Sequence, residues 1–173
     1  MEGKSLIVYY SWVGNTHVVA EEMARQTGFS SVRLEERRPR PFEKYIAASF
    51  GAMLGLRSRL RPIDWKLAGV GTVYLGAQVW AGHSTQAINA FLAKADLRGK
   101  RVRLFLTRAD ETTQQKVIDS IARRVRARGG TFVDCLGLTA PWDPKDVKIL
   151  APETIRDEVR DWLGSEGTKG ATP

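Results

Sequence analysis

The chain has a single cysteine, Cys135, among its 173 residues. One thiol excludes an internal disulfide bond and a metal site built from several thiolates. The sequence also lacks a run of roughly 18 consecutive apolar residues, which a membrane-spanning helix would need. The apolar stretch near the N-terminus is interrupted at Trp12 and is too short for a signal peptide. The sequence therefore predicts a cytoplasmic protein with no membrane span.

The sequence has fewer acidic than basic residues. The 19 Asp and Glu residues are outnumbered by 27 Lys and Arg residues, so the formal net charge is +8. Many arginines lie in three groups, at residues 37–40, 57–61 and 123–128. Such groups either neutralise the phosphates or carboxylates of a partner or form solvated helix faces. Because no nucleic-acid recognition motif accompanies them, the sequence does not favour nucleic acid as the partner.

Short apolar runs typical of buried strands alternate with segments of helical periodicity. We expect strands at residues 5–10, 31–35, 71–75, 102–106 and 131–136, and helices at 16–27, 85–95, 113–128 and 152–163. This alternation predicts an α/β fold in three layers, a doubly wound five-stranded parallel sheet with helices on both faces. Ligands of such sheets bind beyond the carboxyl ends of the strands, where the strand order reverses. The loops after Tyr10, Leu75 and Leu106 therefore form the candidate site.

The length fits one domain, which we expect over residues 1–163, with a flexible tail at 164–173. Residues 37–66 separate the second and third strands and carry an amphipathic helical pattern at 42–56. This inserted segment is either a lengthened second helix packed on the sheet or a flap. A flap would reach the ligand site or a partner subunit with its apolar end, so a homodimer stays open.

The first loop reads Ser-Trp-Val-Gly-Asn-Thr and runs from Ser11 to Thr16, between a buried strand and an amphipathic helix. Free backbone amides at the N-terminus of a helix bind anions, because the donors and the helix dipole act together. Gly14 lets the backbone approach a phosphate closely. The loop lacks the lysine of a Walker loop and the glycines of a dinucleotide fingerprint. It therefore predicts a phosphate site of another kind.

Two motifs resemble those of the flavodoxin family. The strand SLIVYY followed by Ser-x-x-Gly-x-Thr resembles the flavodoxin phosphate loop, and the segment Leu-Gly-Ala-Gln-Val-Trp-Ala-Gly at 75–82 is similar to the family's flavin loop after the third strand. The resemblance implies a flavodoxin-like fold with strand order 2-1-3-4-5 and FMN as the cofactor. It implies phosphate contacts from Ser11, Trp12, Val13, Gly14, Asn15 and Thr16, and flavin contacts from Gln78, Val79, Trp80, Ala81, Gly82, Thr107, Arg108 and Asp110.

The sequence departs from the family pattern at several of these positions. Val13 replaces a hydroxyl residue of the phosphate loop, and Gln78 stands where the family often has proline. The third loop, residues 107–110, lacks the glycine-rich or aromatic character usual in the family. Arg108 in this loop either stacks on the flavin or is an ordinary surface arginine.

Three functions follow from these observations. The first is an FMN protein that carries electrons between redox partner proteins or to a small-molecule acceptor. The second is an FMN-dependent NAD(P)H:quinone-type oxidoreductase, because the inserted segment and its arginines could accommodate a pyridine nucleotide. The third is a flavin-less binding or scaffold domain of the same fold. We expect Trp12 and Trp80 to flank the flavin, whereas His17 and His83 fit surface or capping positions better than ligand positions.

Overall fold

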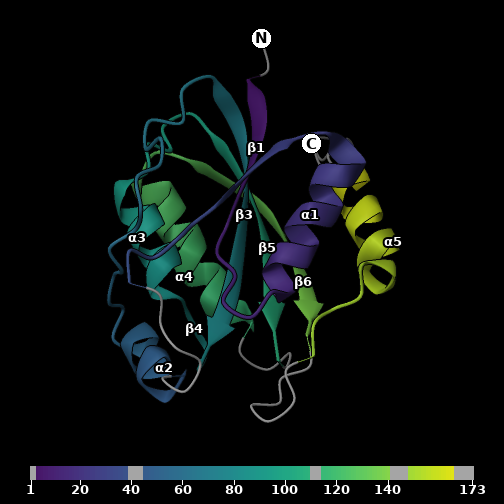
Figure 1. The fold of residues 1–173 in the computed structure, drawn as a ribbon. Helices are drawn as coiled ribbons and strands as arrows, with labels where there is room; N and C mark the ends of the chain where they lie inside the picture. The colour runs from purple at the N-terminus through teal and green to yellow at the C-terminus, as the bar shows by residue number, and fades with distance from the viewer. Residues whose placement is uncertain (1–2, 39–44, 110–113, 141–147, 166–173) are drawn as a thin grey trace.

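The computed structural model describes residues 3–38, 45–109, 114–140 and 148–165 (Figure 1). The elements follow one another in the order β1 (Lys4–Tyr9), α1 (Asn15–Thr27), β2 (Ser30–Arg33), α2 (Tyr45–Met53), β3 (Val70–Trp80), β4 (His83–Ser84), α3 (Gln86–Lys94), β5 (Arg101–Arg108), α4 (Gln114–Ala127), β6 (Thr131–Thr139) and α5 (Pro152–Gly164). No helix of these described ranges is long and apolar enough to cross a membrane.

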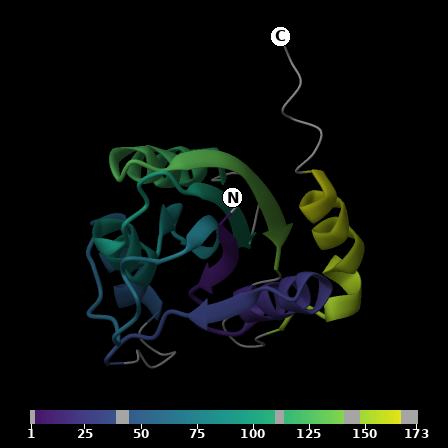
Figure 2. The ribbon, with the colours of Figure 1, turned by 90° about the horizontal axis from the view of Figure 1, so that it is seen from above.

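The sheet has the order β2-β1-β3-β5-β6, and all of these neighbours pair in parallel. The short strand β4 pairs antiparallel with the end of β3. Counted over the parallel strands, this is the predicted order 2-1-3-4-5, and β4 was not predicted. Helices α1 and α5 lie on one face of the sheet and α3 and α4 on the other (Figures 1 and 2). The predicted three-layer α/β architecture is therefore confirmed.

Each face of the sheet has its own apolar core. Alternate residues of a strand point to opposite faces, so adjacent residues of β1 belong to different cores. Ile7 packs in the core that includes Val19 and Met23 of α1, whereas Val8 packs in the core that includes Ile88 and Phe91 of α3. Burial on both faces is the reason that β1 reads as an almost continuous apolar run.

The first helix ends at the residue expected from the sequence. Gly28 follows the last turn of α1 with φ of 71°, and its N–H donates to the carbonyl of Ala24 at 2.8 Å. A left-handed residue at this position satisfies an orphan carbonyl of the helix end, and glycine adopts it without strain.

Two central strands are longer than the sequence predicted. β3 continues beyond Leu75 to Trp80, and β5 continues beyond Leu106 to Arg108. The two extensions pair with each other, with Gln78 opposite Thr107. The prediction that residues 76–80 and 107–108 are loops was wrong. Both strands have neighbours on each side, and pairing with them overrides the weak strand propensity of the polar residues.

The inserted segment between β2 and β3 contains α2, which ends at Met53 and not at residue 56 as predicted. Residues 39–44, where the predicted helix begins, and the tail beyond residue 165 lie outside the described part of the chain. Several large apolar side chains of α2 and the turn after it are exposed: Ile46, Phe50, Met53, Leu54 and Leu56. In Figure 1, α2 lies below α3 at the end of the molecule where β3 meets β4.

Candidate functional site

The first loop lies where β1 ends and α1 begins. Gly14, the residue that precedes α1, has φ of 120°, a value that side-chain-bearing residues rarely adopt. Its carbonyl accepts the first hydrogen bond of the helix, from the Val18 N–H at 3.0 Å. Among the described residues, the N–H groups of Val13, Asn15 and Thr16 donate to no protein acceptor. Three such donors at a helix N-terminus make an arrangement that can bind an anion.

Two other amides of this loop are engaged within the protein. The Trp12 N–H donates to Oε1 of Gln78 at 2.9 Å, and the Gly14 N–H donates to Oγ of Ser11 at 3.2 Å. The first bond joins the loop to β3, at the position where the flavodoxin pattern often has proline. Gln78 was expected to contact the flavin, and no role in holding the first loop was predicted for it. The bond explains how this glutamine contributes to the site even though its side chain is buried.

The hydroxyl groups of Thr16 and Thr107 lie 2.8 Å apart, and both side chains are buried. Thr16 belongs to the first turn of α1 and Thr107 to the end of β5. This hydrogen bond brings together the first and third segments that the sequence singled out. Neighbouring Arg108 is also buried, so its interpretation as a surface arginine was wrong. Asp110 lies outside the described residues.

An aromatic cluster borders the loop. The rings of Trp12 and Trp80 have their centroids 5.0 Å apart at an interplanar angle of 61°, and Tyr10 meets Trp80 edge-on at 6.1 Å. Trp80 is 9% exposed and packs in the core. The two tryptophans predicted to flank a ligand therefore contact each other.

The chain turns back directly after Trp80. Trp80 pairs with His83, and the two residues between them, Ala81 and Gly82, have φ of 46° and 73°. Positive φ at both central positions defines a type I′ hairpin turn, which matches the twist of the flanking strands. Val79 pairs with Ser84 in the same hairpin. Of the second predicted loop, only Ala81 and Gly82 form a turn, which lies at the carboxyl end of β3.

Two further side chains, those of Arg33 and His17, lie near the loop, and the sequence did not predict a role for either of them there. The guanidinium of Arg33, at the end of β2, donates to the carbonyl of Ser11 at 2.8 Å. Nδ1 of His17 lies 2.7 Å from the hydroxyl of Tyr9, and the two rings stack. Burial raises the pKa of Tyr9, the nearby charge of Glu21 raises it further, and Arg33 lowers it. Arg33 thus supplies a positive charge to a loop whose own sequence has no lysine or arginine.

A segment far away in the sequence covers part of the loop. The Leu150 N–H donates to Oδ1 of Asn15 at 2.8 Å, and Ile149 lies so close to Gly14 that an added Cβ there would be 3.1 Å from Cδ1 of Ile149. Nothing in the sequence indicated this contact, because more than 130 residues separate its two sides.

The described residues offer neither a metal site nor a reactive thiol. The described ranges contain no group of three or more His, Cys, Asp or Glu residues that could hold a metal ion. Burial in β6 raises the pKa of the Cys135 thiol to about 12, and the charge of Asp134 adds to this effect. A thiol with such a pKa stays protonated and is a poor nucleophile.

No family model matches the sequence, and no curated protein matches it either. Solved structures do resemble the chain. A protein from Bacteroides eggerthii DSM 20697, named only provisionally as a flavoprotein, has a TM-score of 0.72 at 17% identity, over 97% of this chain and 100% of the other. A flavoprotein from Lactobacillus acidophilus NCFM, solved in complex with FMN, has a TM-score of 0.62 at 21% identity, over 78% of this chain and 93% of the other.

A third match is oxidised flavodoxin 1 from Bacillus cereus, with a TM-score of 0.54 at 17% identity over 93% of this chain and 97% of the other. Identities this low establish the fold and not the activity. The chain has a flavodoxin-like fold.

Proposed function

We propose that this flavodoxin-like chain binds FMN at the carboxyl edge of its sheet and carries electrons between redox partners. The observation that supports this proposal is the set of three amides without a protein acceptor, those of Val13, Asn15 and Thr16, next to the Trp12–Trp80 pair. A phosphate group needs donors of this kind, and a flavin ring needs an aromatic neighbour.

In this proposal the amides and the hydroxyl hydrogen of Ser11 bind the phosphate. Each hydrogen bond to a charged phosphate contributes about 1.5–3 kcal/mol, so the phosphate dominates the affinity. Arg33 adds positive charge through its bond to the Ser11 carbonyl. The hairpin at Ala81 and Gly82 and the Trp80 side chain would face the ring. Bound FMN would supply the one- or two-electron chemistry, and the chain would supply binding and orientation.

The names of two similar structures agree with this proposal. The Lactobacillus acidophilus protein is a flavoprotein solved with FMN, and the Bacillus cereus protein is a flavodoxin. The chain departs from the flavodoxin pattern at Val13, at Gln78 and in the third loop at 107–110. The amide of Val13 remains available although its side chain cannot donate, and Gln78 holds the first loop.

A comparison of FMN with riboflavin tests the proposal, because riboflavin lacks only the phosphate. On titration into the purified full-length chain, FMN should show quenched emission and a dissociation constant at least about a hundredfold lower than riboflavin, as expected for the loss of two or more charge-assisted hydrogen bonds. Equal affinities would show that the amides hold no phosphate. No binding of either flavin would leave a flavin-less binding domain as the function.

One observation favours a second candidate, an FMN-dependent NAD(P)H:quinone-type oxidoreductase. A cationic cavity adjoins the Ala81–Gly82 hairpin, which gives a second ligand room beside the flavin. Steady-state oxidation of NADPH by a quinone, catalysed by the FMN-loaded protein, would support it. Absence of turnover with protein that has bound FMN would favour the electron carrier.

A further inference from the structure

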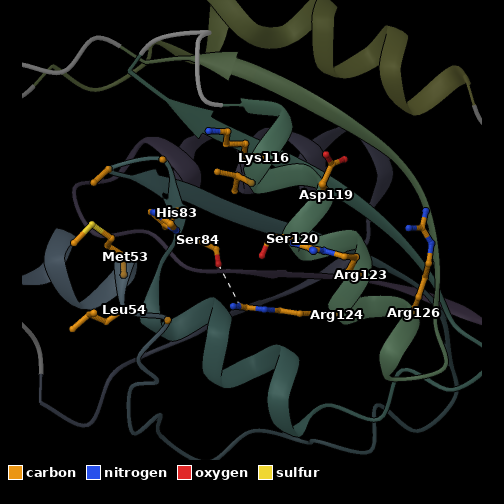
Figure 3. Close-up of a pocket in the computed structure, with 15 residues that line it drawn as sticks. Met53, Leu54, His83, Ser84, Lys116, Asp119, Ser120, Arg123, Arg124 and Arg126 are labelled. Atoms are coloured by element: carbon orange, nitrogen blue, oxygen red, sulfur yellow. Dashed lines mark hydrogen bonds between the residues drawn. The ribbon is translucent and has the colours of Figure 1, made fainter.

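A groove separates α2 and the β3–β4 hairpin from α4 (Figure 3). Its volume is about 910 Å³, within the range of sites that hold small molecules. One wall is apolar and includes Met53 and Leu54; the opposite wall is cationic and includes Lys116, Arg123 and Arg124. In Figure 3 the side chains of Arg123 and Arg124 extend from α4 toward Ser84, whereas that of Arg126 extends away.

Some arginines of the chain have a carboxylate partner and others do not. Elsewhere in the chain, carboxylates lie within ion-pair distance of several arginines: Arg25, Arg61, Arg98, Arg103, Arg156 and Arg160. Within the part of the chain that the structure describes, no carboxylate lies at such a distance from Arg57, Arg123 or Arg124. One carboxylate, that of Asp119, also lines the groove, but these three guanidinium groups form no ion pair with it.

Arg124 is held in place by buried polar groups. Its guanidinium donates to Oδ1 of Asn89 and approaches Oγ of Ser84 at 3.5 Å. Ser84 donates to the same Asn89 oxygen at 2.7 Å, and the Asn89 amide donates to the carbonyl of Leu56 at 3.0 Å. Because Ser84 and Asn89 are buried, this network fixes the guanidinium before any ligand arrives.

The surroundings of Arg124 are unfavourable for its charge. Burial lowers the pKa of Arg124, and the neighbouring charges of Arg57 and Arg123 lower it further. Arg57 does not line the groove itself. Together with Arg124 it lines a smaller cavity of about 300 Å³, so Arg124 borders both cavities and cationic side chains continue from one into the next. An anion placed among the three guanidinium groups would offset both the burial and the mutual repulsion.

We propose that this groove is a second ligand site, separate from the loop at Ser11–Thr16, and that it binds the phosphate groups of a nucleotide-sized small molecule. Arg124 is the fixed anchor, and Arg57 and Arg123 complete the phosphate contacts. Met53 and Leu54 form the apolar wall on which the ring of such a ligand rests.

A second copy of this chain does not fit the groove. An identical molecule also carries a net charge of +8 and would bring the same arginines to a symmetric contact, so the repulsion would oppose association. A phosphorylated small molecule matches both walls, because its phosphates carry negative charge and its base is apolar on both faces. The proposal rests on the groove alone and does not require that FMN binds.

Calorimetric titration of the full-length chain with inorganic pyrophosphate, ADP and NADP⁺ tests the site. We expect saturable binding of ADP, and a loss of about tenfold in affinity for each of Arg57→Gln and Arg123→Gln, since each variant removes one charge-assisted contact. Both side chains are exposed, so these variants should fold. Arg160→Gln removes the same charge from α5, and it should change the affinity less than twofold.

Three results would overturn the proposal. Equal weakening by Arg160→Gln would assign the effect to net charge and not to the groove. Displacement of ADP by saturating FMN would show that the two ligands share one site. Tight binding of single-stranded poly(U), without measurable binding of pyrophosphate or ADP, would assign the surface to nucleic acid.

Discussion

Trp12 and Trp80 belong to two separate sequence motifs, and the fold brings their rings to a centroid distance of 5.0 Å. Trp12 is only partly buried, so its ring has surface available for a ligand. An aromatic contact with a flavin contributes about 0.5–1.5 kcal/mol beyond the area that it buries.

Trp12→Leu should therefore weaken FMN binding by about three- to tenfold and leave the fold unchanged. The flavin fluorescence titration measures the change. Trp65→Leu is the matched control, because Trp65 is also a half-buried tryptophan in an aromatic contact, with Phe91. A similar loss of affinity in the control would indicate a general effect on stability.

Glu22 has a carboxylate that is 3% exposed and accepts hydrogen bonds from Arg25 at 2.6 Å and Gln26 at 2.7 Å. The hydrogen bond from Arg25 is the main cause that lowers the pKa of Glu22 to about 2. A carboxyl group whose pKa is lowered on folding stabilises the native state above its ordinary pKa near 4.5, and this stabilisation is lost as the pH falls toward 2.

Glu22→Gln should therefore lower the free energy of unfolding at pH 7 by about 1–2 kcal/mol and have a smaller effect at pH 3. Urea unfolding at the two pH values measures both numbers. Glu158→Gln, on the exposed surface of α5, should change neither by more than about 0.5 kcal/mol. An equal loss for Glu22→Gln at both pH values would contradict the role of the charge.

Several residues of the site could not be identified from the sequence. The motifs indicated Ser11, Gly14 and Thr16 because loop chemistry is local. The contact of Arg33 with the loop depends on strand register, and that of Ile149 depends on the path of a distant segment. A local sequence pattern predicts neither of them. The sequence therefore predicts the loop of the candidate site but not the residues that surround that loop.

At the level of elements, the β3–β4 hairpin is the main feature that the sequence did not predict. Its turn residues are Ala81 and Gly82, and Ala81 adopts the left-handed region with φ of 46°. This conformation costs a residue with a Cβ roughly 1 kcal/mol, and asparagine tolerates it better than alanine does. The Ala-Gly pair lacks the Asn-Gly signal that would have predicted a type I′ turn.

Ala81→Asn should raise the free energy of unfolding by about 0.5–1 kcal/mol, because it places the preferred residue at the first position of the turn. Thermal and urea unfolding measure the gain. Ala109→Asn is a control at an exposed position that has no positive φ, and it should give no increase. Destabilisation by Ala81→Asn would contradict the turn geometry.

The element pattern was otherwise predictable. Strands buried on both faces read as apolar runs, and helices α1, α3, α4 and α5 show the spacing of one buried face. The errors are at strand ends, where Gln78 and Thr107 are polar but are paired within the sheet. Pairing with neighbouring strands determines the secondary structure at such positions, and this pairing cannot be predicted from a single sequence.

At the scale of the whole molecule, a buried ion pair joins the sheet to the last helix. Arg103 of β5 is fully buried and donates to both carboxylate oxygens of Asp134 of β6, at 2.8 and 2.7 Å. Its guanidinium also donates to the carbonyl of Trp162 at 2.8 Å and lies over the Trp162 ring at 4.3 Å. One arginine thus connects two strands and α5.

Asp134→Asn should lower the free energy of unfolding by about 3–5 kcal/mol, because it leaves the charge of Arg103 buried without its carboxylate. Asp157→Asn removes an exposed partner of Arg160 and should cost less than about 1 kcal/mol. Chemical unfolding curves of both variants compare the two effects. A small loss for Asp134→Asn would show that Arg103 obtains its compensation elsewhere.

The contact between Ile149 and Gly14 bears on how quickly a bound cofactor can leave. Ile149 is 54% exposed, and the bond from Leu150 to Asn15 holds it beside Gly14, next to the amides that would bind a phosphate. A residue in that position slows both the association and the dissociation of a cofactor. It therefore changes the residence time of the cofactor more than its affinity. The lifetime of the complex would then be set by a stretch of chain that lies beyond the last strand of the sheet.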